Sequence, residues 1–314
     1  MRFSSSTLPF VSSTLLLLSS HSLAVPIDST TTDNNDNSTS NTTGLGYVKF
    51  VGERTKVSHS TMNTIVGKDS SSSSGSLDVS LQNEDFIYVM NVTIGSNKEQ
   101  IQLQIDTGSS DFWVIGSNNT WCETGGDSTH DCSIYGTFDA SKSTTWKDTG
   151  VDFSIVYQDG TGANGTWGTD NVEISGVDIS DVYIAVSDEA SENFGVLGIG
   201  YRNDESTADA RNENPFTYDN LPISLKNQGL ISKNAYSIYL DDKTQTNTAN
   251  LLFGAIDHSK YYGRLGLIPI ASDSTELDII LNSVSLHDNS DQSDRAMAKG
   301  AQRALLDSEL EISH

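Results

Sequence analysis

The amino-acid sequence predicts an all-β protein, and three features of the chain carry this prediction. From Glu84 onward, short apolar runs are separated by glycine, asparagine and aspartate, the pattern of strands joined by turns. Residues 87–94 and 100–105 frame a short turn and predict a hairpin. In residues 151–174, apolar and aromatic side chains recur at every second position before a glycine-rich turn. With 314 residues, 35% of them hydrophobic, the chain is large enough to bury a sizeable core.

The N-terminal residues predict a secretory signal peptide over 1–24. Arg2 supplies a positive charge, residues 11–18 contain a run of four leucines, and Ser22 and Ala24 place small side chains at the usual cleavage spacing. We therefore expect a secreted protein, either extracellular or in the cell wall. No later segment of the sequence approaches the roughly 20 apolar residues of a membrane-spanning helix, so we expect no membrane span.

Residues 25–82 are predicted to be a propeptide. They begin with a run rich in serine, threonine, asparagine and aspartate, which cannot bury enough apolar surface to fold alone. Arg54, Lys56 and Lys68 add positive charge that can pair with carboxylates elsewhere in the chain at neutral pH and release them in acid. A glycosylated linker is the alternative interpretation of this segment.

The chain is organised around residues 104–115, in which an apolar strand runs into a tight turn that carries one carboxylate, Asp106. Gly108 allows the backbone to turn where a Cβ would clash. Thr107 and Ser109 offer hydroxyl groups that can hold the Asp106 carboxylate in one rotamer. We therefore place the chemistry of the protein at this turn.

This stretch resembles a known catalytic motif. The order hydrophobic-Asp-Thr-Gly-Ser, continued by Phe112, Trp113 and Val114, matches the first motif of pepsin-like aspartic peptidases and is most similar to the secreted candidapepsin and yapsin type of yeasts. The resemblance implies a bilobal all-β fold and an endopeptidase that hydrolyses extended polypeptides at acidic pH with an Asp-activated water. It also implies that Asp106 is catalytic and that no cofactor or metal takes part.

Residues 151–174 resemble the flap hairpin that closes over the peptide in this family, with Tyr157 at the position of the flap tyrosine. The family pattern has glycine where this chain has Gln158. An ordinary cross-strand aromatic is the alternative interpretation of the tyrosine. The flap and substrate-binding residues implied by the resemblance are Tyr157, Asp159, Gly160 and Thr161.

Cys122 and Cys132, the only cysteines, lie ten positions apart in a loop rich in glycine, aspartate and serine. In an oxidising compartment a disulfide is the simplest interpretation. A zinc site that also uses His130 and Asp131 is the alternative, although the loop offers few ligands. Sequons mark five candidate glycosylation sites, namely Asn37, Asn41, Asn91, Asn118 and Asn164.

We expect residues 83–235 to form a complete N-terminal catalytic lobe with the flap, and residues 236–314 to form an incomplete start of the C-terminal lobe. Within the first lobe, residues 194–200 resemble the glycine-containing segment that runs behind the catalytic turn in the family. The remaining expected elements are a helix at 221–230 capped by Gly229, a strand at 235–240, and opening strands of the second lobe at 251–257, 261–270 and 277–286.

Residues 304–308 resemble the start of the second catalytic motif, so the resemblance implies that Asp307 is the second catalytic residue. The motif would continue with glycine, but Glu309 occupies that position, and seven residues follow Asp307. We therefore expect a C-terminally truncated chain with little or no activity as a monomer. In a complete site, two carboxylates held close together share one proton, so that one activates water while the other donates a hydrogen bond.

The formal net charge of −24 argues against nucleic acid or an anionic membrane as a partner. It suits a secreted protein that works in acid, where most carboxylates lose their charge. Three alternatives to a monomeric peptidase stay open. They are a homodimer in which each chain contributes Asp106, a non-catalytic protein that binds peptides with the cleft and flap, and a gene-model fragment of a full-length peptidase.

Overall fold

The structure of the protein is a computed structural model. It describes residues 47–52, 75–83, 87–122, 130–209, 211–212, 214–240, 249–263, 265–288 and 293–308. The predicted signal peptide, the candidate glycosylation sites Asn37 and Asn41, and Glu309 lie outside these residues.

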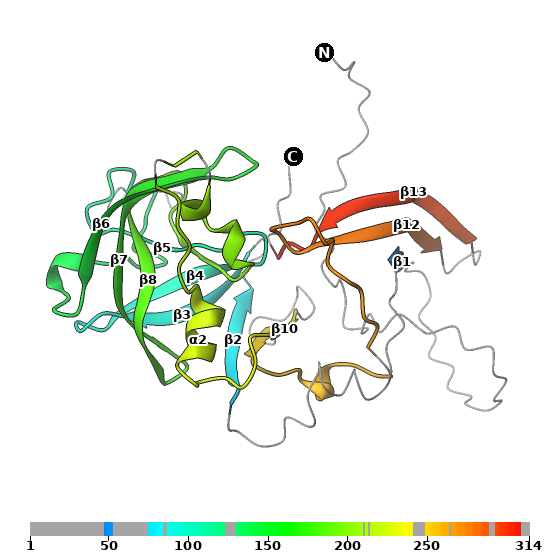
Figure 1. The fold of residues 1–314 in the computed structure, drawn as a ribbon, viewed down its shortest axis with the longest axis horizontal. Helices are drawn as coiled ribbons and strands as arrows, with labels where there is room; N and C mark the ends of the chain where they lie inside the picture. Colours follow the sequence, from blue (N-terminus) through cyan, green and yellow to red (C-terminus); the bar gives the residue numbers. More distant parts are fainter. Residues whose placement is uncertain are drawn as a thin grey trace, which may run out of the picture.

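The described chain is built almost entirely from strands (Figure 1). The strands are β1 (Tyr47–Gly52), β2 (Leu77–Asn83), β3 (Tyr88–Ile94), β4 (Glu99–Asp106), β5 (Phe112–Ile115), β6 (Lys147–Val156), β7 (Gly162–Ile174), β8 (Val177–Ala190), β9 (Gly195–Gly198), β10 (Tyr236–Tyr239), β11 (Ala249–Phe253), β12 (Asp278–Asp288) and β13 (Ser293–Leu305). The helical elements are α2 (Leu221–Asn227) and the short 3-10 helices η1 (Ala140–Lys142), η2 (Arg202–Asp204), η3 (Ser206–Ala208) and η4 (His258–Lys260). The prediction of an all-β protein is therefore confirmed.

Most of the strands join one ten-stranded sheet in the order β10-β11-β2-β3-β4-β9-β5-β8-β7-β6. An additional pairing of β3 with β7 closes the strands from β3 to β7 in this order into a six-stranded barrel. The pairings of β4 with β9 and of β5 with β8 are parallel, whereas the others around the barrel are antiparallel. Closure between β3 and β7 gives the carboxylate-bearing strand, β4, a rigid support, while β10 and β6 remain at the ends of the sheet.

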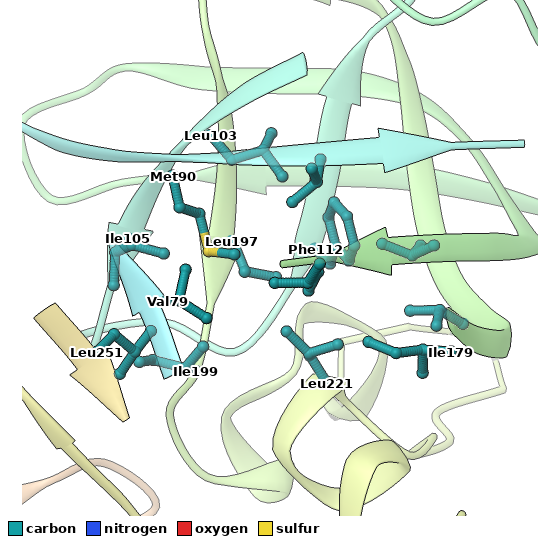
Figure 2. Close-up of a cluster of buried hydrophobic side chains, with 14 of the residues drawn as sticks. Val79, Met90, Leu103, Ile105, Phe112, Ile179, Leu197, Ile199, Leu221 and Leu251 are labelled. Carbon is teal, nitrogen blue, oxygen red and sulfur yellow. The ribbon is translucent and has the colours of Figure 1, made fainter. Parts of the chain in front are cut away.

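The core fills the barrel and the space between it and α2 (Figure 2). Leu103 of β4, Phe112 of β5 and Leu197 of β9 are each at most 2% exposed and come from neighbouring strands. Leu221 of α2 covers this cluster, while Leu251 extends it along β11. Burial of this many large apolar side chains, at about 25 cal/mol per Å² of area removed from water, stabilises the barrel.

Several expected elements are confirmed. The first hairpin is the antiparallel pair β3 and β4, whose turn contains Gly95 with a φ of +75°. The second is the antiparallel pair β6 and β7. The helix α2 is followed by Gly229, whose φ of +73° is the left-handed conformation that ends a helix without steric cost. The segment 194–200 supplies β9, which lies between β4 and β5.

The second half of the chain differs from the expectation in two ways. Strand β11, expected to open a second lobe, extends the main sheet by pairing with β2, and β10 pairs in turn with β11. All but the last residue of β2 lie in the segment predicted as propeptide. The expected strand at 261–270 is wrong, because among the described residues of this segment only Ile270 pairs, through an isolated bridge to Ile279. Alternating side chains indicated extended chain in these regions but could not indicate the sheet it would join.

A separate three-stranded sheet, β1-β12-β13, contains the expected strand at 277–286 and leads to Asp307. Figure 1 shows β12 and β13 as a long hairpin at the opposite side of the view from the barrel. Strand β1, also from the predicted propeptide, pairs antiparallel with β12 from Tyr47 opposite His287 to Gly52 opposite Leu281. Residues 306–308 then run from β13 back to the barrel, as their hydrogen bonds to the Asp106 turn show.

Candidate active site

Asp106 lies at the end of β4, where the strand leaves the barrel and turns. Its side chain is 2% exposed, and its Oδ1 accepts a hydrogen bond from the Gly108 backbone N–H at 2.6 Å. On the far side of the turn, the Ile199 N–H donates to the Asp106 carbonyl at 2.8 Å. Local backbone geometry and the strand behind it therefore fix the position of this carboxylate.

Asp307 lies against the same turn, although 201 positions separate it from Asp106 in the sequence. A Cβ placed on Gly108 would lie 2.7 Å from Oδ2 of Asp307 and 2.8 Å from its Cγ. The glycine is therefore required for the approach of the second carboxyl group. From the sequence, the backbone conformation of the turn is the expected reason for a glycine here, but Gly108 does not adopt a positive φ. The position requires glycine because Asp307 lies against it.

Two hydroxyl groups join the Asp106 turn to residues 306–308 through nearly reciprocal hydrogen bonds. Thr107 follows Asp106, and its Oγ1 donates to the Leu306 carbonyl at 2.8 Å. Ser308 follows Asp307, and its Oγ donates to the Ile105 carbonyl at 2.8 Å. The same serine oxygen accepts a hydrogen bond from the Thr107 N–H at 3.0 Å. Each hydroxyl thus bonds the carbonyl that precedes the other carboxylate, which brings the two carboxyl groups side by side.

This exchange corrects the expected role of Thr107. Its hydroxyl holds the opposite segment at Leu306 and not the rotamer of Asp106. Ser109 stays beside Asp106, where its hydroxyl and backbone lower the pKa of that carboxyl, but the Ser109 hydroxyl forms no hydrogen bond of standard geometry. The sequence pointed to the residues of the turn but not to the partners of Thr107, because those partners lie about 200 positions away.

The pKa of Asp106 is raised to about 7. Burial of the carboxylate is the main cause, and the negative charge of Asp307 adds to it. The Gly108 N–H and the polar groups of Ser109 lower the pKa and so act in the opposite direction. A buried carboxyl with a raised pKa beside a second carboxyl can hold one proton for the pair over a wide pH range.

The hairpin of β6 and β7 carries the predicted flap residues. The Tyr157 hydroxyl accepts a hydrogen bond from Nε1 of Trp113 on β5 at 2.8 Å, which ties the base of the turn to the barrel. Oδ1 of Asp159 accepts from the Thr161 N–H at 2.8 Å and the Thr161 hydroxyl at 2.7 Å. Gly160 has a φ of +90°, a left-handed conformation that favours glycine at this turn.

A cavity of about 180 Å³ lies under this hairpin. Tyr157, Asp159 and Thr161 line it from the hairpin, and Gln104, two residues before Asp106, lines it from β4. Its other walls are Ile87, Trp113, Gly162, Glu192, Phe194 and Val196. The structure therefore brings three of the four predicted flap residues to one cavity, while Gly160 does not line it.

A buried polar network behind the turn was not predicted from the sequence. Asp111 is 0% exposed and accepts hydrogen bonds from the Tyr218 hydroxyl at 2.6 Å and the Ser206 N–H at 2.9 Å. Glu205 accepts from the Tyr218 N–H at 2.9 Å, and burial raises its pKa to about 8. Burial raises the pKa of Asp111 as well. Asp111, five positions after Asp106, is the one sequence signal that could have pointed to this network.

Cys122 and Cys132 form a disulfide, with 5.5 Å between their Cα atoms, as expected. The side chains of Asn91, Asn118 and Asn164 are exposed. In the described part of the chain, no three His, Cys, Asp or Glu side chains group in a way that would hold a metal ion. The described residues include no helix long and apolar enough to cross a membrane.

Comparison with known proteins agrees with this geometry. Residues 87–309 match the family model of eukaryotic aspartyl proteases. The chain belongs to this pepsin-like aspartyl protease family. The match begins beside β3 and ends just after Asp307 and Ser308, so it includes both carboxylates and both hydroxyl residues that join them.

Several relatives of this aspartyl protease chain are fungal. Candidapepsin-3 from Candida albicans is 41% identical over 209 residues, which cover 66% of this chain and 50% of the relative. An acid protease from Saccharomycopsis fibuligera is 36% identical over 239 residues, which cover 75% and 57%. The solved structure of an aspartic proteinase from Irpex lacteus is similar with a TM-score of 0.54 and 25% identity, over 66% of this chain and 56% of that one. The chain spans about half the length of the curated relatives it matches.

Proposed function

We propose that this protein is an acid endopeptidase whose catalytic dyad is Asp106 and Asp307. The observation that carries the proposal is the contact of Asp307 with Gly108, in a site where Thr107 and Ser308 exchange hydrogen bonds across the two halves. Two carboxyl groups in this position share a proton, a behaviour established for aspartic proteases as a class. Membership of the eukaryotic aspartyl protease family supports the same assignment.

In the proposed reaction, the dyad binds the peptide bond while it carries one proton. The ionised carboxylate takes a proton from a water molecule held between the two groups. That water attacks the carbonyl carbon, and the protonated carboxyl transfers its proton to the carbonyl oxygen, which gives the tetrahedral gem-diol. The carboxyl that took the proton from water then passes it to the amide nitrogen while a gem-diol hydroxyl returns a proton to the other carboxylate, so that the C–N bond breaks without a covalent intermediate and the dyad again carries one proton.

The flap residues Tyr157, Asp159, Gly160 and Thr161 are proposed to cover the substrate. Two features support this role: the glycine turn at the tip of the β6 and β7 hairpin, and the cavity directly beneath it. Closure of such a hairpin excludes water and orders an extended peptide in the cleft. The proposed substrates are therefore extended polypeptides.

Secretion and processing are part of the proposal. Relatives from Candida albicans carry the name secreted aspartic protease, and the predicted signal peptide over 1–24 points the same way. We propose cleavage after the signal peptide, a propeptide within 25–82, a first lobe over 83–235, and the start of a second lobe from 236. Exposed Asn91, Asn118 and Asn164 are proposed to carry glycans.

The experiment that tests the function is peptide hydrolysis by the purified 314-residue chain between about pH 3 and pH 9, with internally quenched peptides. We expect weak but measurable cleavage, and we expect Asp106→Asn and Asp307→Asn each to reduce kcat/KM by at least about a hundredfold. The exposed Asp152→Asn is the matched control and should leave the rate unchanged.

The pH dependence of the same assay adds a second criterion. Because the pKa of Asp106 is raised to about 7, activity should fall as the pH rises through that value and the shared proton is lost. Cleavage that survives Asp106→Asn would refute the dyad. Peptide binding without any cleavage by the unsubstituted chain would favour a non-catalytic binding protein instead.

A further inference from the structure

We propose that strand β1, which lies in the segment predicted as propeptide, is a positioning element of the active site. It completes the sheet that leads to Asp307, and its pairing with β12 has to persist for the second carboxyl group to stay in place. The inference rests on the proposed function, because it takes Asp307 as the second member of the dyad. It reverses the role expected of this part of the segment, since an inhibitory propeptide has to leave before the enzyme can act.

Strand β1 belongs to the three-stranded sheet and not to the barrel. It pairs antiparallel with β12 from Tyr47, opposite His287, to Gly52, opposite Leu281. Among the described residues, β1 pairs with no strand of the main sheet. Strand β2, most of which lies in the same predicted segment, differs because it pairs with β11 and β3 inside the main sheet. The two strands of the segment therefore support different parts of the molecule.

Strand β12 is the middle strand of its sheet, and without β1 it would become an edge. What remained would be the hairpin of β12 and β13, and a two-stranded hairpin alone is at best marginally stable in water. Side-chain burial adds little, because the described side chains of β13 are mostly exposed. The buried side chains described in β12, namely Asp278, Ile279 and Leu281, all lie near its beginning. The rest of the hairpin therefore depends on its backbone ladder.

The ladder between β12 and β13 is irregular in the region where β1 pairs. Its register shifts twice within residues 281–285. Such a shift leaves a residue unpaired and weakens the ladder locally. Strand β1 crosses the second shift, between Val284 and Ser285, without a break, because Phe50 and Lys49 pair with these two residues in turn. The third strand therefore supports β12 where its pairing with β13 is weakest.

The hairpin leads directly to the second carboxyl group. Leu306, the residue after β13, donates its N–H to the carbonyl of Leu277, the residue before β12, at 3.1 Å. The Leu306 carbonyl in turn accepts the Thr107 hydroxyl of the Asp106 turn. Both ends of the hairpin therefore meet at the residue that precedes Asp307. Separation of the two strands would spread toward this point and draw Asp307 away from the turn.

The experiment compares two variants of the full chain by amide hydrogen exchange. Val48→Pro/Lys49→Pro removes two successive backbone N–H groups of β1. One of them faces β12, because successive N–H groups point to opposite edges of a strand. Val48→Ala/Lys49→Ala is the matched control, since it changes the same side chains and keeps both N–H groups. Exchange at residues 283–287 of β12 reports whether β1 has detached.

We expect the proline pair to speed exchange at the Leu306 and Thr107 amides by at least about tenfold, because local opening exposes both. The alanine pair should stay within about threefold of the unsubstituted chain. The Gly198 amide, which bonds the Asp111 carbonyl inside the barrel, should keep its slow exchange in both variants. Its protection shows that the barrel is folded.

The titration of Asp106 is a readout that support of the hairpin alone would not change. The negative charge of Asp307 is one cause of the raised pKa of Asp106, so displacement of Asp307 should lower that pKa in carboxyl-carbon NMR. The alanine pair should leave the pKa unchanged. In peptide hydrolysis, the proline pair should lower kcat/KM about tenfold. Detachment of an inhibitory segment would raise it instead.

Each other outcome decides against the inference or against the function beneath it. Fast exchange in β12 with unchanged exchange at Leu306 and Thr107 would overturn the inference. Slow exchange in β12 of the proline variant would also overturn it, because pairing with β1 would then not protect that strand. Loss of protection at Gly198 would show that β1 supports the whole fold and not the Asp307 half. Failure of the unsubstituted chain to cleave peptides would contradict the proposed function alone, because exchange and titration do not require catalysis.

Discussion

The two halves of the proposed dyad are alike at their carboxylates and different in the structure behind them. Each carboxylate is followed by a hydroxyl residue, Thr107 or Ser308, that bonds a carbonyl of the other half. Behind Asp106, the backbone N–H groups of residues 198–200 donate three hydrogen bonds to the turn. Behind Asp307, the chain arrives from β13, whose described side chains are mostly exposed.

This difference indicates that the Asp106 turn positions the Asp307 segment. The Asp106 turn is part of a closed barrel and is held by its own strands. Residues 306–308 depend on contacts with that turn, together with the hydrogen bond from the Leu306 N–H to the Leu277 carbonyl at 3.1 Å. We therefore expect changes behind Asp106 to unfold the barrel, and changes at the contact between the halves to release Asp307 without unfolding it.

The largest effect is expected at Gly198, behind the first half. A Cβ there would lie 2.5 Å from the Asp111 backbone nitrogen and 2.6 Å from the Ser110 backbone nitrogen. Because neither atom belongs to a flexible side chain, the strand itself must shift. Gly198→Ala should lower the free energy of unfolding by about 3 kcal/mol, measured by urea denaturation.

Gly266 provides the matched control in the other half of the chain, since a Cβ added there meets no atom within 4 Å. Gly266→Ala should change the free energy of unfolding by less than about 0.5 kcal/mol. Equal effects of the two substitutions would contradict the claim that the first half is the more rigidly supported one.

A smaller effect is expected at the contact between the halves. Ser308→Ala removes the hydroxyl that bonds the Ile105 carbonyl and the Thr107 N–H, and leaves two buried backbone groups unpaired. The substitution should therefore make the bound position of residues 306–308 less favourable by about 2 kcal/mol. We expect the segment to detach, with faster hydrogen exchange at the Thr107 amide and little change in the unfolding of the barrel.

Thr107→Ser is the control for this prediction, because it keeps a hydroxyl for the Leu306 carbonyl. It should retain slow exchange at the same amide. If Ser308→Ala lowers the free energy of unfolding of the barrel as much as Gly198→Ala, the barrel and residues 306–308 unfold as one cooperative unit. That result would contradict the expectation that Asp307 can be released while the barrel stays folded.

The smallest effect concerns the pH dependence of stability. The pKa values of Asp106, Asp111 and Glu205 are all raised in the folded protein, above all by burial. Between about pH 4 and pH 8 the folded state therefore binds more protons than the unfolded state, and stability must fall as the pH rises. Thermal unfolding should show a lower midpoint at pH 8 than at pH 4.

Glu205→Gln should reduce this decrease, since it removes one of the protons that folding binds. The exposed Asp152→Asn makes the same change in net charge and should leave the decrease unaltered. A midpoint that is independent of pH, or equal behaviour of the two variants, would show that buried carboxyl groups do not determine the pH dependence.

The sequence predicted what local patterns encode. Alternating apolar residues and turn glycines located the two hairpins, and the motif around Asp106 located the first carboxylate. The disulfide followed from two cysteines in a predicted oxidising compartment. These features depend on residues close together in the chain, which a single sequence displays directly.

The remaining features depend on contacts between distant segments. The hydrogen bonds between Thr107 and residues 306–308 join positions about 200 apart. Most described side chains of β13 are exposed, so no buried face marked it as a strand. Glu192 lines the same cavity as Asp159 only because the segment after β8 and the turn between β6 and β7 come together in the fold. No local pattern carries this information.

The central claim is that Asp106 and Asp307 form one coupled acid–base pair, and carboxyl-carbon NMR titration of the full chain tests it most directly. We expect Asp106 to titrate near pH 7, and we expect Asp307→Asn to lower this pKa while burial, the larger cause, keeps it above the ordinary range. An Asp106 carboxyl that titrates near pH 4, or whose titration is unchanged by Asp307→Asn, would contradict the pairing of the two residues.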